Sequence, residues 1–398
     1  MKILKPFYYD DFNCIADKCK DSCCIGWTVH IDKKSYNKYK KVKGDFGRFL
    51  NKNIIRNRKK LSDLSYGKMK LDNNRCPLLS EGNLCDLYIN LGGDDLCNTC
   101  KIYPRIIKKY GEICEKNLTL SCPEVARIIS SFNKSFSFNL DYEILTNSEK
   151  EYINEEKYSN KLYNLLWEAR SLSIEVAQFK EIEIWKRLLF IKLVEEKIQN
   201  VINTSAYDQA DNLINSLRES ITDSQIIKLL DNIKRVDKVK LLFISTFIKA
   251  RSNVGISNNT FFGLLVDFNI LVTGKSENET LQLLESKEKE FNEYFKEKEY
   301  ILENYIVYNL YNNYMKALYS KDLNKEIVRL ILSYSVIKTL LIARWSKNDK
   351  LLKEEDIIDV LYSFSRILEH SESFINIIYS KIKEAGYDTL AYLTILIR

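Results

Sequence analysis

From about residue 131 to the end of the chain, hydrophobic positions follow a helical spacing. Apolar residues recur at steps of three, four and seven, which places them on one face of a helix, at Ile174, Ala177, Ile184, Leu188, Ile191, Val194 and Ile198. This run predicts one long amphipathic helix. Further helices are predicted over 148–170, 207–219, 222–253, 258–272, 277–319, 323–346, 354–370 and 372–384. Residues 131–398 are therefore expected to form an all-helical domain.

Several predicted helix ends carry residues that suit them. Thr222, Asp322 and Ser371 each precede a helical run, and their side chains can accept hydrogen bonds from the first free N–H groups of a helix. Gly386 follows the last residues of another run, where a left-handed residue ends many helices. These four residues support the predicted boundaries.

The first 130 residues have a different pattern, with short apolar pieces and no sustained period. They contain 8 of the 12 glycines, all 4 prolines and all 10 cysteines. Such a segment cannot form a large regular core, and bound metal would supply the missing stabilisation. The sequence therefore predicts a mainly α protein, in which an irregular, cysteine-rich head of residues 1–130 binds metal and precedes the all-helical domain of residues 131–398.

Charge is also concentrated in the head. Residues 1–125 carry 24 Lys and Arg against 15 Asp and Glu, whereas the rest of the chain carries 37 against 39. The most basic stretch, 48–70, lacks the interleaved aromatic residues that stack on bases, so we favour a solvated face over nucleic-acid binding. No signal-peptide pattern and no apolar run of about 18 residues occur, which predicts a cytoplasmic protein without membrane contact.

The ten cysteines form short groups along the head. They are Cys14, Cys19, Cys23 and Cys24, then Cys76 and Cys85, then Cys97, Cys100, Cys114 and Cys122. In a reducing compartment, clustered thiols are poor candidates for disulfides and good ligands for zinc or iron–sulfur clusters. The chain has only two histidines, and proline directly follows Cys76 and Cys122 as in ferredoxin-like ligand runs, so we favour iron–sulfur over zinc. Adjacent Cys23 and Cys24 either serve two centres or contribute one ligand.

Taken in order, these motifs resemble the flagellin lysine-N-methylase (FliB) family, and the head is also similar to the wider group of CxxCxxCC zinc- or iron-chelating domains. The resemblance is carried by Cys23-Cys24-Ile25-Gly26-Trp27, Cys76-Pro77-Leu78, Cys100-x2-Tyr103-Pro104-Arg105 and Ser121-Cys122-Pro123-Glu124. It is strongest over about residues 8–130. In the helical part only Leu302-Glu303-Asn304-Tyr305 and Glu369-His370 contribute to it.

The resemblance implies an enzyme that transfers a methyl group from S-adenosylmethionine to lysine side chains of its partner flagellin, with one or two 4Fe-4S clusters. It places the metal ligands on Cys14, Cys19, Cys23, Cys24, Cys76, Cys85, Cys100 and Cys122. Cys97 and Cys114 lie outside the family pattern. Arg105 and Arg127 recur in its motifs and are candidates to bind a cofactor carboxylate through paired hydrogen bonds.

The remaining sequence gives no independent support for the cofactor. No G-x-G-x-x-G turn of a nucleotide-binding βαβ unit occurs, and the radical-type C-x3-C-x2-C run is interrupted because Gly26 follows Cys23 at the third position. The catalytic residue that activates lysine and the oligomeric state are not predicted. The alternative function is an iron–sulfur or zinc-binding adaptor or electron-transfer protein without methyltransferase activity.

Overall fold

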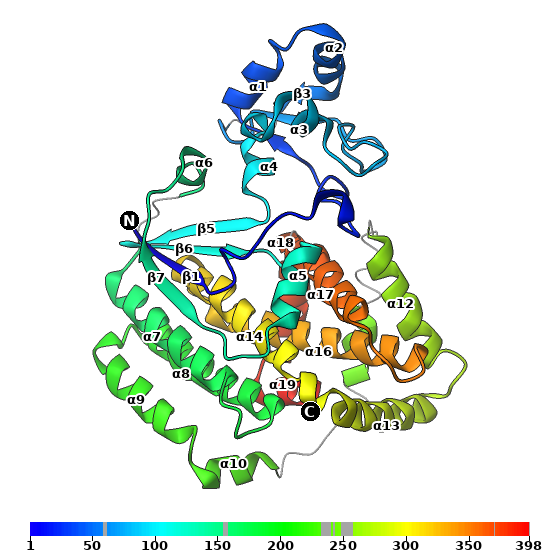
Figure 1. The fold of residues 1–398 in the computed structure, drawn as a ribbon. Helices are drawn as coiled ribbons and strands as arrows, with labels where there is room; N and C mark the ends of the chain where they lie inside the picture. Colours follow the sequence, from blue (N-terminus) through cyan, green and yellow to red (C-terminus); the bar gives the residue numbers. More distant parts are fainter. Residues whose placement is uncertain are drawn as a thin grey trace. The chain divides into compact units, whose positions relative to one another are not determined.

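The computed structural model describes residues 1–58, 62–153, 158–231, 240–241, 243–247, 258–369 and 371–397. The chain forms two compact units (Figure 1). We call the first the cysteine unit, Met1–Ile128 with Ser137–Glu155, and the second the helical unit, Ile129–Phe136 with Glu156–Arg398. Helices predominate, and every described strand lies in the cysteine unit, so the predicted mainly α fold class is confirmed. The functional division at residue 130 stays a prediction.

The cysteine unit contains two small sheets. The larger has the order β5-β6-β1-β7, with β1 at Lys2–Pro6, β5 at Arg105–Tyr110, β6 at Ile113–Leu118 and β7 at Phe138–Tyr142. Strand β1 pairs parallel with β6 and antiparallel with β7, while β5 and β6 form an antiparallel hairpin. The smaller has the order β2-β4-β3, with β2 at His30–Ile31, β3 at Ile54–Arg56 and β4 at Gly67–Met69. These sheets were not predicted from the sequence, because strands this short contain too few positions to show alternation.

Short helices connect the strands of the cysteine unit. They are α1 (Lys33–Tyr39), α2 (Gly44–Asn53), α3 (Asp86–Leu91), α4 (Asn98–Ile102), α5 (Pro123–Ser131) and α6 (Asn147–Lys150). Cys97 is the N-cap of α4, and α5 begins directly after Cys122. Both helices therefore fix the backbone position of a cysteine.

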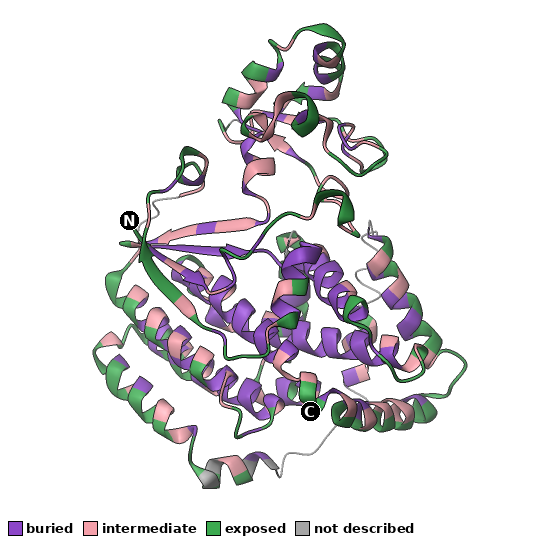
Figure 2. Cartoon of the chain, in the orientation of Figure 1, coloured by how far each residue is buried: buried purple, intermediate pink, exposed green. Residues whose placement is uncertain are grey.

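The helical unit is built around α16, Leu323–Lys347, which is buried on most of its faces (Figure 2). Around it pack α8 (Ile184–Thr204), α12 (Asn259–Val272), α13 (Glu277–Phe295), α14 (Tyr300–Asn313), α17 (Glu354–Glu369), α18 (Glu372–Glu384) and α19 (Leu390–Ile397). Helix α14 is buried from Ile301 to Asn312 and forms a second part of the core. The outer helices include α7 (Asn160–Ala177), α9 (Ala210–Ser220) and α10 (Ser224–Asp231). None of the described helices is long and apolar enough to span a membrane.

Four of the predicted helices match α12, α16, α17 and α18 within one or two residues. Residues next to the ends of these helices determine where the helices begin and end. The Asp322 carboxylate accepts from the N–H of Lys325, and Gly386 follows α18 with φ 70°. Ser371 occupies the N-cap position of α18 without a side-chain hydrogen bond. At the start of α10, Asp223 rather than Thr222 accepts from a helical N–H.

Three predicted helices are wrong in extent. The single helix expected over 174–198 is divided, because α7 ends at Ala177 and α8 begins at Ile184. The helix expected over 148–170 corresponds to α6 and the first part of α7. The helix expected over 277–319 is interrupted by 3-10 turns at Lys296–Lys298 and Tyr314–Lys316. Helix α19 was not predicted, and most of the helix expected over 222–253 lies outside the described residues.

Candidate functional site

Trp27 connects the segments that carry three of the candidate cysteines. Its indole Nε1 donates a hydrogen bond to the backbone carbonyl of Cys23, and its ring centroid lies 5.4 Å from that of Tyr103. The Tyr103 hydroxyl lies 3.2 Å from the Ser121 hydroxyl, next to Cys122. These contacts hold distant parts of the cysteine motif together, so Trp27 has a structural role at the thiols.

Five cysteines share one core of the cysteine unit, and we call them the enclosed group. Cys76 and Cys97 are 4% and 0% exposed, and Cys24, Cys85 and Cys100 pack against the same core. The backbone N–H of Cys76 donates a hydrogen bond to the carbonyl of Cys24 at 2.7 Å. The Cys97 thiol donates to the backbone carbonyl of His30 at 3.5 Å. The enclosed group therefore brings together cysteines from distant parts of the sequence.

The neighbouring thiols of Cys23 and Cys76 favour the thiolate form of Cys24. They lower the pKa of Cys24 to about 3, with the larger effect from Cys23, against the opposing effect of burial. The same interactions, together with burial, raise the pKa of Cys23 and that of Cys76. The thiolate is the form of cysteine that binds metal, so the shift at Cys24 has the direction that a ligand role requires.

The other cysteines of the family pattern, Cys14, Cys19, Cys23 and Cys122, lie near one another, and we call them the outer group. Burial raises the pKa of Cys122 to about 12, and the charges of Cys19 and Cys14 contribute to this rise. The interaction with Cys24 and burial have the largest effects on the pKa of Cys23, and both raise it. The charges of Cys14 and Cys122 add to this rise. Cys14 and Cys23 are exposed to solvent. The outer group is thus more open than the enclosed group.

The cysteines supply the type of donor atom, sulfur, that a thiolate-bound metal requires. All ten cysteines are free thiols, and nine of them belong to the two groups. Sulfur donors without histidine suit iron–sulfur clusters and four-cysteine zinc sites. Within the described ranges, however, no three His, Cys, Asp or Glu side chains are arranged to hold a metal ion. The structure brings the eight predicted ligands into neighbouring groups, and their role as ligands stays a prediction.

Cys114 and His30 lie apart from this chemistry. Cys114 is on β6 and packs in another core with Ile3, Ile102, Ile107 and Leu145. The His30 ring nitrogen Nδ1 lies 2.8 Å from the Ser65 hydroxyl, in agreement with a structural role. His370 lies outside the described residues.

Asp32 positions the helix that carries Cys97 and Cys100. Its buried carboxylate accepts a hydrogen bond from the N–H of Asn98 at 3.0 Å, at the start of α4. The other carboxylate oxygen accepts from the N–H of Ser35 at 2.8 Å, at the start of α1. One side chain therefore satisfies free N–H groups of two helices.

We expect Asp32→Ala to lower the free energy of unfolding by about 1–3 kcal/mol, because it removes two charge-assisted hydrogen bonds to buried backbone. Urea unfolding of the metal-free, reduced protein measures the effect. The control is Asp63→Ala, which removes only an exposed ion pair of 3.4 Å with Lys33, of a kind worth about 1 kcal/mol or less. Equal losses in the two variants would contradict the role assigned to Asp32.

The two arginines proposed to bind a cofactor have partners within the protein. Arg127 forms a paired contact with Glu124 one turn earlier in α5, with Nε–Oε2 at 2.9 Å and Nη2–Oε1 at 2.6 Å. The guanidinium of Arg105, at the start of β5, lies 5.5 Å from the ring centroid of Phe12. A cofactor carboxylate would therefore compete with Glu124 for Arg127. Cofactor binding by either arginine stays a prediction.

The family motif of the helical unit has structural contacts. Glu303, in α14, accepts a hydrogen bond of 2.7 Å from the buried guanidinium of Arg187. The Asn304 amide donates to the backbone carbonyls of Ile129 and Phe132, at 3.0 and 2.7 Å, at the end of α5. These residues stabilise the core and the end of a helix.

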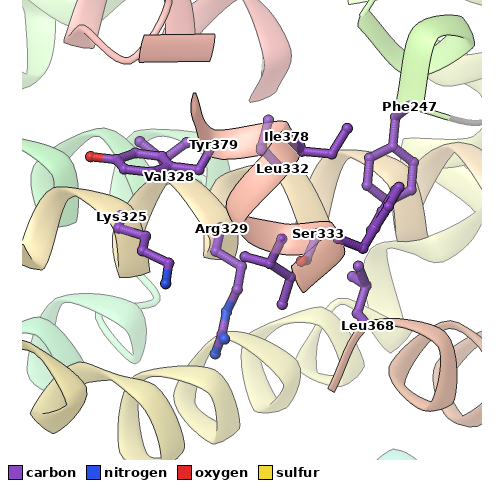
Figure 3. Close-up of a pocket in the computed structure, with 11 residues that line it drawn as sticks. Phe247, Lys325, Val328, Arg329, Leu332, Ser333, Leu368, Ile378 and Tyr379 are labelled. Atoms are coloured by element: carbon purple, nitrogen blue, oxygen red, sulfur yellow. The ribbon is translucent and has the colours of Figure 1, made fainter. Parts of the chain in front are cut away.

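A cavity of the helical unit, between α16, α17 and α18, is too small for a cofactor (Figure 3). Its volume of about 20 Å³ has room for one water, whereas small-molecule pockets measure roughly 300–1,000 Å³. A wider hollow of about 470 Å³ in the cysteine unit is lined by Met1, Lys109, Glu143, Ile144, Leu145, Lys150 and Ile153. No cysteine lines either of these two cavities, so neither identifies a cofactor site at the thiols.

Comparison with known proteins identifies the family. The profile of the FliB lysine N-methylase C-terminal domain matches residues 170–396. The lysine-N-methylases of Salmonella typhimurium strain LT2 and Salmonella choleraesuis are each 24% identical to this chain, over 93% of its length and 92% of theirs. The flagellar biosynthetic protein FliU of Salmonella muenchen is 34% identical over 132 residues, which are 32% of this chain and 77% of that protein. No solved structure shows a significant match.

The family match covers more than half of the chain and lies entirely in the helical part, where the sequence motifs are weak. The predicted family and the predicted class of enzyme, a methyltransferase that acts on lysine, are therefore confirmed. This chain belongs to the FliB lysine N-methylase family.

Proposed function

We propose that this enzyme transfers a methyl group from S-adenosylmethionine to lysine side chains of flagellin, and that its thiols bind one or two 4Fe-4S clusters required for the transfer. The names of the relatives support this substrate, since two are lysine-N-methylases and a third is a flagellar biosynthetic protein. The cluster rests on one observation, the gathering of nine free thiols into the enclosed and outer groups. When bound, a cluster supplies iron that can exchange an electron or hold a further ligand.

The reaction sets a requirement on the lysine. Its nitrogen forms a new C–N bond to the methyl carbon while the C–S bond of the sulfonium breaks, and S-adenosylhomocysteine and a proton leave. Free lysine has a pKa near 10.4, so it is protonated at neutral pH and cannot attack. The enzyme therefore has to bind the lysine in a desolvated environment or accept its proton.

The test begins with protein purified in the absence of oxygen. We expect about four iron and four sulfide per chain for one cluster, or about eight of each for two, and little zinc. With unmethylated flagellin and S-adenosylmethionine, mass spectrometry should then show methylated lysines. Removal of the iron with a chelator should stop the transfer, and reconstitution with iron and sulfide should restore it.

Each half of the proposal can fail separately. Methyl transfer by protein that contains no iron would contradict the required cluster. An intact cluster with no transfer to flagellin, and no binding of S-adenosylmethionine in anaerobic calorimetry, would contradict the flagellin reaction and support the adaptor or electron-transfer alternative.

A further inference from the structure

The thiol of Cys97, which the family pattern leaves out, lies among thiols that the pattern includes. We propose that Cys97 is a metal ligand in the same centre as Cys100. This inference rests on the proposed function, since it concerns the metal that the thiols bind. It adds a ninth cysteine to the candidate ligands.

Cys97 stands close to Cys100 in the fold. It occupies the N-cap of α4, and Cys100 stands three residues later in the same short helix. Both side chains pack in one core of the cysteine unit, where the Cys97 thiol donates a hydrogen bond of 3.5 Å to the backbone carbonyl of His30. Cys97-x2-Cys100 is also the spacing with which cysteine pairs bind zinc and iron–sulfur clusters.

The core around Cys97 is rich in cysteine. Cys97 is fully buried in the core that contains Cys76, and Cys24, Cys85 and Cys100 pack against that core. Cys97 therefore shares its core with four cysteines of the family pattern.

Cys114 is a buried cysteine for which we propose no metal-ligand role. It is 0% exposed, as Cys97 is, and it too lies outside the family pattern. Its neighbours in the core are Ile3, Ile102, Ile107 and Leu145. The two residues thus match in type and burial and differ in their surroundings. They form a matched pair for an experiment.

The experiment compares Cys97→Ser and Cys114→Ser in the full chain. Both variants are reconstituted anaerobically with iron and sulfide, and separately titrated with Co²⁺, whose thiolate absorption bands report sulfur ligands. We expect Cys97→Ser to bind Co²⁺ at least about tenfold more weakly than wild type and to retain less iron, because it loses a ligand. Cys114→Ser should match wild type in both measurements.

A Cys97→Ser variant with wild-type Co²⁺ affinity and iron content would overturn the inference. Wild-type protein that binds neither iron nor Co²⁺ would instead overturn the metal part of the proposed function, and the inference with it. If Cys97→Ser does not fold, alkylation of the wild type replaces it. Metal should then slow alkylation of Cys97 at least about tenfold and leave Cys114 unchanged, and equal effects on both thiols would contradict the inference.

Discussion

Cys100→Ser and Cys122→Ser should each lower methyl transfer to flagellin by at least about 100-fold and remove iron from the enzyme. Serine is close to cysteine in size, but its hydroxyl does not become a soft anionic ligand at neutral pH. The change therefore removes the metal-binding atom with little change in packing. Cys100 belongs to the enclosed group and Cys122 to the outer group, so the two variants test both sets of thiols.

The iron that each variant retains distinguishes one centre from two. With a single cluster that uses both groups, the two variants should lose all of their iron. With one cluster in each group, each variant should keep about half of the wild-type iron, and the remaining cluster should be the one in the untouched group. Iron, sulfide and visible absorption measured on the same samples give this result.

Cys114→Ser is the control, since it removes a buried thiol that no other thiol contacts in the described core around it. It should retain the iron and the methyl transfer of the wild type. Far-ultraviolet circular dichroism of the three variants should agree, which excludes misfolding as the cause of a loss. Iron-free Cys100→Ser or Cys122→Ser protein with full methyl transfer would contradict the requirement for the cluster.

The sequence predicted which residues carry the candidate site better than it predicted how they meet. The clustering of cysteines was visible because nothing similar occurs after residue 122. Their grouping depends on contacts between distant segments, such as Trp27 with Tyr103, and on the pairing of β1 with β6 and β7 across more than 100 residues. No local pattern reports such pairings. Cys97 was not predicted as a ligand because it lies outside the family pattern.

Helix prediction succeeded where the signal is local and failed where a break preserves the period. The N-cap Asp322 accepts a hydrogen bond from the N–H of Lys325, so the signal for the start of α16 lies within four consecutive residues. That helix was predicted correctly. Between Ala177 and Ile184 the step is seven residues, which equals about two helical turns. Apolar positions therefore stay in phase across the break, and hydrophobic spacing cannot reveal it. The break between α7 and α8 is instead marked by the buried side chain of Arg187, which donates to the carbonyls of Ile182 and Ala177.

Arg187→Met should lower the free energy of unfolding of the helical unit by about 3–5 kcal/mol. The guanidinium donates to the carbonyls of Ile182 at 2.8 Å and Ala177 at 3.2 Å, where the chain leaves α7 and enters α8. It also donates to the Glu303 carboxylate at 2.7 Å, and both side chains are only 3% exposed. Methionine fills similar space but leaves a buried charge and helix-end carbonyls without these bonds. Thermal unfolding should shift by on the order of 10 °C.

Two further variants separate the buried charge from the loss of any arginine. Arg218→Met removes an Arg–Glu contact of similar length, 2.9 Å to Glu175, but that pair is exposed and should cost about 1 kcal/mol or less. In the double variant Arg187→Met, Glu303→Gln, the buried carboxylate that has lost its arginine is gone and only the longer contact of Glu303 with Lys180 at 3.8 Å is removed with it, so part of the lost stability should return. A double variant as unstable as the sum of the single variants would show that the carboxylate is not the source of the loss. Recovery would instead mean that the contact between Arg187 and Glu303 stabilises the break mainly by keeping a buried charge paired.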